Sequence, residues 1–142
     1  MTVKALVTGV IMATDRDFDW VTTRASCSVQ GVFALLLLET EKDVKRRNSL
    51  LGAEKGFRFE FEGTESSFQV SKIINGLSSH AYNPKSVQFS VNGESIAVSG
   101  SVKAAFSATV ALNNDGDCRL KIGDEELMNW QFRMRALQEL FF

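Results

Sequence analysis

The second half of the chain alternates apolar and polar residues in runs separated by short turn motifs, and this pattern constrains the fold most strongly. Asn92-Gly93 is the clearest of these motifs, because both residues tolerate the positive φ angles of a two-residue hairpin turn. A turn at this pair would place Phe89 opposite Ile96, with the apolar faces of the two strands on one side. The pattern therefore predicts an antiparallel hairpin.

The next strand is expected to run from residue 102 to residue 112, and the turn that follows allows two loop lengths. A four-residue loop would set Val110 opposite a charged residue. A three-residue loop, with Gly116 in the left-handed conformation, sets Val110 opposite Leu120 and Leu112 opposite Cys118. Because a slip of one residue turns every side chain to the other face of the sheet, the three-residue loop is the prediction.

The first half of the chain also favours strands, since its apolar residues either alternate with polar ones or form short continuous runs. Strands are expected at residues 3–12, 20–29 and 32–39. The polar segment 40–54 that follows is expected to contain only a short helical turn. It would tuck Leu50 and Leu51 inward.

Three phenylalanines at alternating positions give the clearest strand signal of the first half; they are Phe57, Phe59 and Phe61. Charged residues separate them, so the three rings are expected to face the core. A short internal helix is predicted next, from Thr64 as N-cap to Leu77. Its apolar stripe would contain Val70, Ile73 and Ile74, and Gly76 would end it.

The C-terminal segment has apolar residues at helical spacing and also alternates as a strand would. Its helix-favouring composition decides for a helix, with the acidic residues at 124–126 near its start. The fold class expected is therefore α+β. A single domain, residues 1–142, would contain a curved and mostly antiparallel sheet, a meander in its second half, packed against the short internal helix and the C-terminal helix.

The side-chain composition argues against catalysis, because the chain has eleven phenylalanines and one histidine. No triad, phosphate loop or cofactor motif can be assigned, so we expect a protein that is not an enzyme and has no cofactor or metal. The net charge of −1 provides no global attraction for nucleic acid. The longest apolar run, residues 32–38, is too short to span a bilayer. The chain would be cytoplasmic if complete and exported if a leader had been removed.

Other candidate sites have simpler explanations. Asp15, Asp17 and Asp19 have the spacing of a calcium loop, but the glycine and the bidentate glutamate that such a loop needs are missing. His80 has no assignable partner and is expected in a surface loop. The two cysteines are expected to be buried thiols in a reducing compartment; a single disulfide is the alternative that their spacing leaves open.

A basic cluster on the polar segment, Lys45, Arg46 and Arg47, raises the question of single-stranded nucleic acid. Such proteins combine a cationic surface with exposed aromatic rings on which bases stack. The three alternating phenylalanines are the nearest aromatic residues, and they are expected to face the core. Nucleic-acid binding is therefore only the third functional interpretation.

A series of short motifs resembles a known superfamily. A strand ending in Leu-Leu-Leu-Glu is followed by a Leu-Leu-Gly turn (residues 50–52), a strand closing on Gly63 and a helix from Phe68 to Leu77. A meander carrying Val-Ser-Gly (residues 98–100) follows. This order resembles the bacterial single-domain members of the tubular lipid-binding (TULIP) superfamily. The resemblance implies a curved sheet wrapped around a long helix, with lipid tails in an apolar groove. It transfers no functional residue.

The leading functional expectation is non-enzymatic binding of an apolar, lipid-like ligand between the curved sheet and the C-terminal helix. The expected ligand-binding residues are Leu35, Leu37, Phe106, Val110, Trp130, Met134 and Phe141. The alternative is a structural or protein-interaction module. It would act through its apolar C-terminal helix, either with a copy of itself as a homo-oligomer or with another protein.

Overall fold

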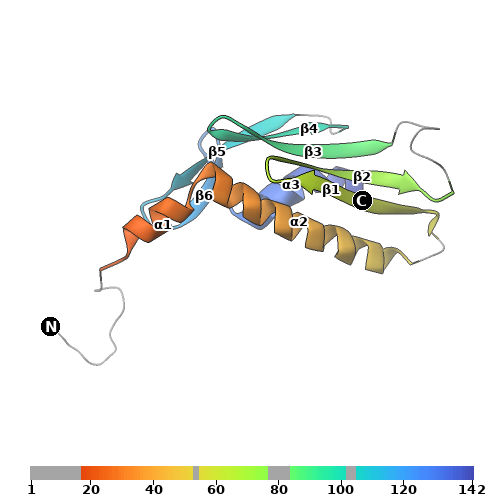
Figure 1. Ribbon diagram of the computed structural model, residues 1–142, viewed down its shortest axis with the longest axis horizontal. Helices are drawn as coiled ribbons and strands as arrows, with labels where there is room; N and C mark the ends of the chain where they lie inside the picture. Colours follow the sequence, from red (N-terminus) through yellow and green to blue (C-terminus); the bar gives the residue numbers. More distant parts are fainter. Residues whose placement is uncertain (1–16, 53–54, 77–83, 102–104) are drawn as a thin grey trace, which may run out of the picture.

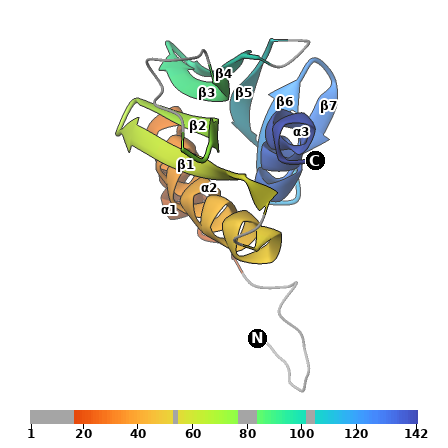
Figure 2. The ribbon, with the colours of Figure 1, turned by 90° about the vertical axis from the view of Figure 1, so that its right-hand side faces the viewer.

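The computed structural model describes residues 17–52, 55–76, 84–101 and 105–142. Within them the chain forms one antiparallel sheet whose seven strands follow each other in sequence order, from β1 to β7 (Figures 1 and 2). The strands are β1 (Phe57–Thr64), β2 (Ser67–Ile74), β3 (Lys85–Asn92), β4 (Ser95–Gly100), β5 (Phe106–Leu112), β6 (Cys118–Ile122) and β7 (Glu125–Leu127). The helices are α1 (Trp20–Ser26), α2 (Val29–Leu51) and α3 (Asn129–Phe141). The α+β class is confirmed.

Figure 2 shows that the sheet is strongly curved and that α2 and α3 both lie on its concave side. One core joins the sheet to the two helices, because the inward faces of the strands pack against one stripe of each helix. Phe33 and Leu36 come from α2, Phe132 and Leu137 come from α3, and Phe89 lies between them on β3. The core is rich in ring contacts, such as the stacked pair of Phe68 and Phe89 with centroids 4.5 Å apart.

The three alternating phenylalanines face the core, as predicted. Phe59 is almost completely buried, and Phe57 and Phe61 are partly buried against the same cluster. The amide of Asn48 on α2 also holds this edge strand. It donates to the carbonyl oxygen of Phe59 and accepts from its N–H, both at 2.8 Å. A helix side chain thus takes the place of a neighbouring strand at one residue of the open edge.

The turn between β5 and β6 confirms the predicted register. Val110 pairs with Leu120 and Leu112 pairs with Cys118. Gly116 has a φ of 84°, which is the left-handed conformation expected for it. The Asn113 side chain accepts from two backbone N–H groups of the turn, which stabilises the three-residue loop.

The hairpin between β3 and β4 is confirmed, but the predicted register is wrong by two residues. Phe89 pairs with Val98 instead of Ile96, because Asn92 belongs to the strand and pairs with Ser95. Gly93 therefore occupies the first turn position, with a φ of 64°. A shift of two residues keeps every side chain on its face, so the apolar pattern alone could not detect it.

The strands predicted at 20–29 and 32–39 are wrong, since these residues belong to α1, to the junction after it and to the N-terminal half of α2. Asp19 caps α1 by accepting from the N–H of Thr22, which also lowers the pKa of the Asp19 carboxyl. Ser28 caps α2 by accepting from the N–H of Gly31. The buried positions of α2 follow helical spacing, whereas the apolar run 32–38 covers both its inner and its outer face. The helical turn expected within 40–54 is part of this long helix.

The short internal helix predicted from Thr64 to residue 77 is also wrong. Its described part is the end of β1, a two-residue turn and β2, in which Val70 pairs with Phe61. Val70 and Ile73 therefore point to opposite faces of a strand rather than along one helical stripe. Gly76 has positive φ but sits in a turn after the strand. Leu77, His80 and the strand expected at 3–12 lie outside the described residues.

The C-terminal helix is confirmed as α3. The acidic residues predicted near its start belong to the turn before β7 and to β7 itself. Glu125 is paired with Arg135 of α3 at 2.7 Å, and this hydrogen bond lowers the pKa of the Glu125 carboxyl. Gln131 caps the helix by accepting from the N–H of Met128 at 2.7 Å.

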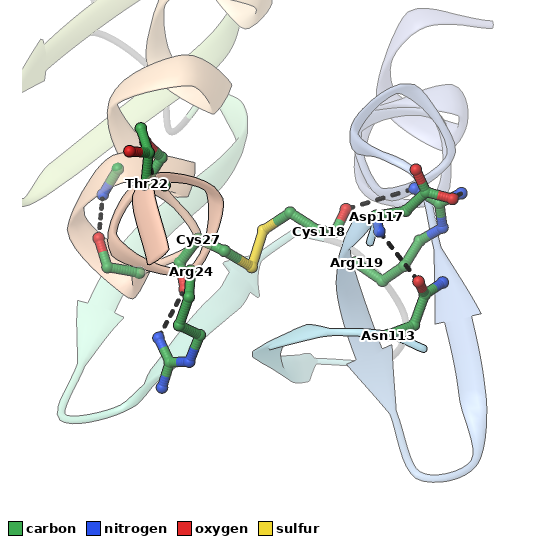
Figure 3. Close-up of a disulfide and its surroundings, with 10 residues drawn as sticks. Thr22, Arg24, Cys27, Asn113, Asp117, Cys118 and Arg119 are labelled. Carbon is green, nitrogen blue, oxygen red and sulfur yellow. Dashed lines mark hydrogen bonds and ion pairs between the residues drawn. A yellow bond between two sulfur atoms is a disulfide. The ribbon is translucent and has the colours of Figure 1, made fainter. Parts of the chain in front are cut away.

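Cys27 and Cys118 form a disulfide, so the expected pair of reduced thiols is corrected. Figure 3 shows the bond joining the junction of α1 and α2 to the start of β6. The Arg24 side chain donates to the carbonyl oxygen of Cys27 at 3.3 Å, beside the bond. The bridge closes a sequence separation of 91 residues and fixes the start of α2 to the far half of the sheet.

Candidate functional site

An open groove of about 280 Å³ lies between α2 and α3. Its α2 wall contains Asp43, Arg46, Arg47 and Leu50, which follow the spacing of one helix face. The turns of α3 from Trp130 to Phe142 form the other wall. The spacing of α2 and α3 therefore creates a surface that neither helix has alone.

The α3 wall is mainly apolar. Trp130, Met134, Leu137 and Phe141 recur at intervals of three or four residues and all line the groove. Leu137 is only 2% exposed and lies at the bottom, where the groove meets the core. Trp130 and Met134 are about half exposed at 52% and 48%. This wall therefore offers apolar surface to solvent along about three helical turns.

An ion pair joins the two walls. Arg133 of α3 donates to the carboxylate of Asp43 on α2 and, at 2.7 Å, to the side-chain oxygen of Asn129. The Arg133 and Asp43 side chains are 13% and 23% exposed, so both charges are largely removed from water. Because each ion compensates the other, they fix the helix spacing and leave little net charge there.

A second arginine is held at the other end of the groove. Nε of Arg47 donates to the carbonyl oxygen of Phe141 at 2.9 Å. Its guanidinium also lies 4.3 Å from the centre of the Phe142 ring, which is a cation–π contact. Arg47 thereby closes the C-terminal turn of α3 against α2 while keeping its positive charge.

Arg46 differs from these two arginines, because its side chain has no hydrogen-bond or ion-pair partner among the described residues. The lining thus contains three arginines and one aspartate, and Arg46 is the cation available to an incoming group. The apolar rim beside it is unusually exposed: Leu50 at 71% and Phe142 at 89%. The surface combines exposed apolar side chains with uncompensated positive charge.

The structure brings together three of the residues expected to bind a ligand and separates the other four. Trp130, Met134 and Phe141 line the groove. Leu35 lies exposed on the outer face of α2, and Leu37 is partly buried against the core. The remaining two, Phe106 and Val110, are on β5 and also pack against the core.

The space between the sheet and α3, where the ligand was expected, contains closely packed side chains. Phe132 and Ala136 of α3 are fully buried there. The Phe132 ring contacts Phe106 with centroids 5.5 Å apart and Phe89 at 6.1 Å. The groove is on the side of α3 that faces α2. Sequence reasoning did not place Arg46, Arg47 and Leu50 in it, although their spacing on a helix would have put them on one face.

The other candidate sites show no cluster in the described part of the chain. Asp19 is occupied as the cap of α1, and Asp15 lies outside the described residues. No group of three or more potential metal-ligating side chains occurs where the structure describes the chain. Lys45 and Arg46 are exposed on α2, whereas the three alternating phenylalanines face the core.

No single helix in the described residues is both long and apolar enough to cross a bilayer. Together α1 and α2 reach the required length and composition, but they are bent by 64°. Several residues on this pair, including Cys27, Phe33 and Leu36, are buried inside the molecule. Burial against the core accounts for their apolar character.

Comparison of the chain with family models, with curated proteins and with solved structures gave no match. The resemblance to the TULIP superfamily therefore stays a prediction.

Proposed function

We propose that the protein is an interaction module that docks another polypeptide on the apolar groove between α2 and α3. The supporting observation is the exposure of large apolar side chains around this groove, above all Phe142, Leu50 and Trp130. Isolated exposed apolar residues are common, but several around one concavity are typical of interaction sites. Tryptophan and arginine, both present here, are the residues that most often dominate binding energy at interfaces.

Photo-crosslinking tests this function in the cells from which the chain comes. A benzophenone amino acid replaces Met134 in the groove or, as the control, Gln88 on an exposed position of β3. We expect a discrete heavier adduct from position 134 only, and its loss when Trp130→Ser is added. No adduct at 134, or equal adducts at both positions, would contradict docking at the groove. An adduct twice the mass of the chain would identify the partner as a second copy.

A second candidate function is the binding of an apolar, lipid-like molecule in the same groove. The supporting observation is its volume of about 280 Å³, close to the ~300 Å³ at which small-molecule sites begin. Native mass spectrometry of the purified protein should then reveal a bound molecule that Met134→Trp removes by filling the groove. A wild-type mass equal to that of the polypeptide alone would count against this function.

Binding of single-stranded nucleic acid has less support. Lys45 and Arg46 are exposed and could contact phosphates, but Arg47 already contacts Phe141 and Phe142. The phenylalanines of β1 are turned toward the core and offer no stacking platform.

A further inference from the structure

We propose that the polypeptide docked in this groove is an amphipathic helix with acidic flanks, supplied by another protein. This inference rests on the proposed function, since it names the partner of the same site. Three properties of the groove lead to it: its charge, its walls and its concave shape.

Charge selects an acidic partner. Asp43 compensates Arg133, whereas Arg46 and Arg47 add positive charge that no other side-chain carboxylate of the described lining balances. An acidic side chain above Arg46 would form the charge-assisted pair that this arginine lacks within the described chain. A basic partner would meet like charge at the rim, and such juxtaposition suppresses wrong partners.

The walls select a helix over an extended segment. Both walls are helices, whose interior backbone N–H and C=O groups are already paired with each other. An extended peptide laid between them would bury its own backbone groups without partners, which is costly. A helix pairs its backbone internally and needs to present only side chains. Trp130 and Phe141 are about three helical turns apart, ~16 Å, a length that apolar positions i, i+4, i+7 and i+11 of a docked helix would span.

The same features disfavour two other occupants. A second copy docked about a two-fold axis through the groove would bring Arg46 and Arg47 toward the same arginines of its partner. A bilayer surface could contact the projecting Leu50 and Phe142, but it could not reach Leu137 at the bottom. A convex helix contacts both the rim and the bottom, so it accounts for the whole surface.

The test uses the full chain and a synthetic probe. The probe is a side-chain-bridged helical peptide of about 14 residues, with leucines at i, i+4, i+7 and i+11 and glutamates on both flanks. One control peptide has lysines in place of the glutamates, and another has the same composition with the leucines dispersed. In a Trp20→Phe background, Trp130 is the single tryptophan and reports binding through its fluorescence.

We expect the glutamate peptide to bind about tenfold more tightly than the lysine peptide at low salt, with the difference shrinking as salt screens the charges. The dispersed peptide should not bind. Arg46→Gln should weaken the glutamate peptide several-fold. Lys45→Gln, which removes the same charge from a neighbouring residue outside the groove lining, should have a smaller effect.

Equal binding of the glutamate and lysine peptides would overturn the acidic partner. Failure of both helical peptides would overturn the helical partner. Binding of the protein to vesicles of anionic phospholipid, without binding of either helical peptide, would overturn the helical partner and identify a membrane surface as the occupant instead. In each case the photo-crosslinking experiment at position 134 tests the proposed docking function independently, because it requires no assumption about the partner's charge or secondary structure.

Discussion

Opening the Cys27–Cys118 disulfide should destabilise the protein by several kcal/mol, chiefly by freeing the unfolded chain. The bond joins residues with a sequence separation of 91. The chain-entropy model assigns to a loop of this size about 15 cal/mol/K, or ~4.6 kcal/mol at 25 °C. With an unfolding entropy of about 2.1 cal/mol/K per residue over 142 residues, the midpoint of thermal unfolding should fall by about 15 °C.

The assay is urea unfolding of three forms: the oxidised protein, the same protein kept in reductant, and the double variant Cys27→Ala/Cys118→Ala. The reduced wild type retains both sulfur atoms. The difference in the free energy of unfolding between it and the double variant therefore measures how much the packing of the sulfur atoms contributes. Alanine is chosen because Cys27 is almost completely buried and a serine hydroxyl there would need a new partner. The free energy of unfolding should fall more steeply with urea in the two forms without the bond, since their unfolded chains are open and expose more surface.

The reasoning would be refuted if the reduced and oxidised proteins differed by less than about 1 kcal/mol with the same urea dependence, since the model requires a difference several times larger. The bond would then constrain an unfolded chain that is already restricted by residual structure. A large loss in the alanine variant alone would instead assign the effect to the missing sulfur atoms.

Three further predictions concern single side chains. Asn48→Ala removes two hydrogen bonds to Phe59 on the edge strand, so urea unfolding should show a loss of about 2 kcal/mol; an unchanged midpoint would refute this. Thr40→Val replaces a buried hydroxyl that lacks a partner in the described structure and should stabilise the protein by about 1 kcal/mol. A lower free energy of unfolding in this variant would refute the reasoning, because it would mean that the hydroxyl is hydrogen-bonded. The hydrogen bond from Arg135 lowers the pKa of the Glu125 carboxyl. The contribution of this pair to the free energy of unfolding is therefore complete above the ordinary pKa of 4.5 and is lost as the pH falls through the lowered pKa. Glu125→Gln should therefore reduce stability near neutral pH and flatten its decline on acidification; an unchanged pH profile would refute it.

Local turn chemistry made the two hairpin turns β3–β4 and β5–β6 predictable, but it fixed the register of only the second one. Gly116 and the face-matching of Val110 with Leu120 left one acceptable register for the β5–β6 turn, and the structure has it. At the β3–β4 hairpin two registers differ by two residues and match the faces equally well. Only the position of Gly93 within the turn separates them, and this depends on backbone geometry more than on side-chain pattern.

The helices α1 and α2 were not predictable in the same way, because the N-terminal half of α2 is apolar on both its buried and its exposed face. Phe33 and Leu36 face the core, while Leu35 and Leu38 in the same run face solvent. A continuous apolar run of this length is also what a strand covered on both sides shows. The helical spacing becomes visible only when the window is extended to Thr40 and beyond, to the buried positions that continue the stripe.

The sequence allowed one wall of the groove to be predicted but not the other, because the second wall depends on how two distant helices pack in the folded chain. Trp130, Met134 and Phe141 share one face of a helix that the sequence predicts, so the α3 wall could be identified. The arginines of α2 appeared only as a basic cluster on a polar segment. Their placement opposite α3 depends on the curvature of the sheet, which brings α2 and α3 together on its concave side (Figure 2).

Exposure alone does not decide which apolar surface docks a partner, because Leu35 and Leu38 are about as exposed as Trp130. The two leucines stand exposed on the outer face of α2, and neither lines the groove. A partner there would have to supply its own concavity and would gain little area per residue. In the groove, α3 supplies the second wall, Leu137 supplies a dry floor, and Arg46 supplies a charge that an acidic group can pair with. Shape and charge together therefore favour the C-terminal half of α2 over its N-terminal half as the site of the proposed interaction.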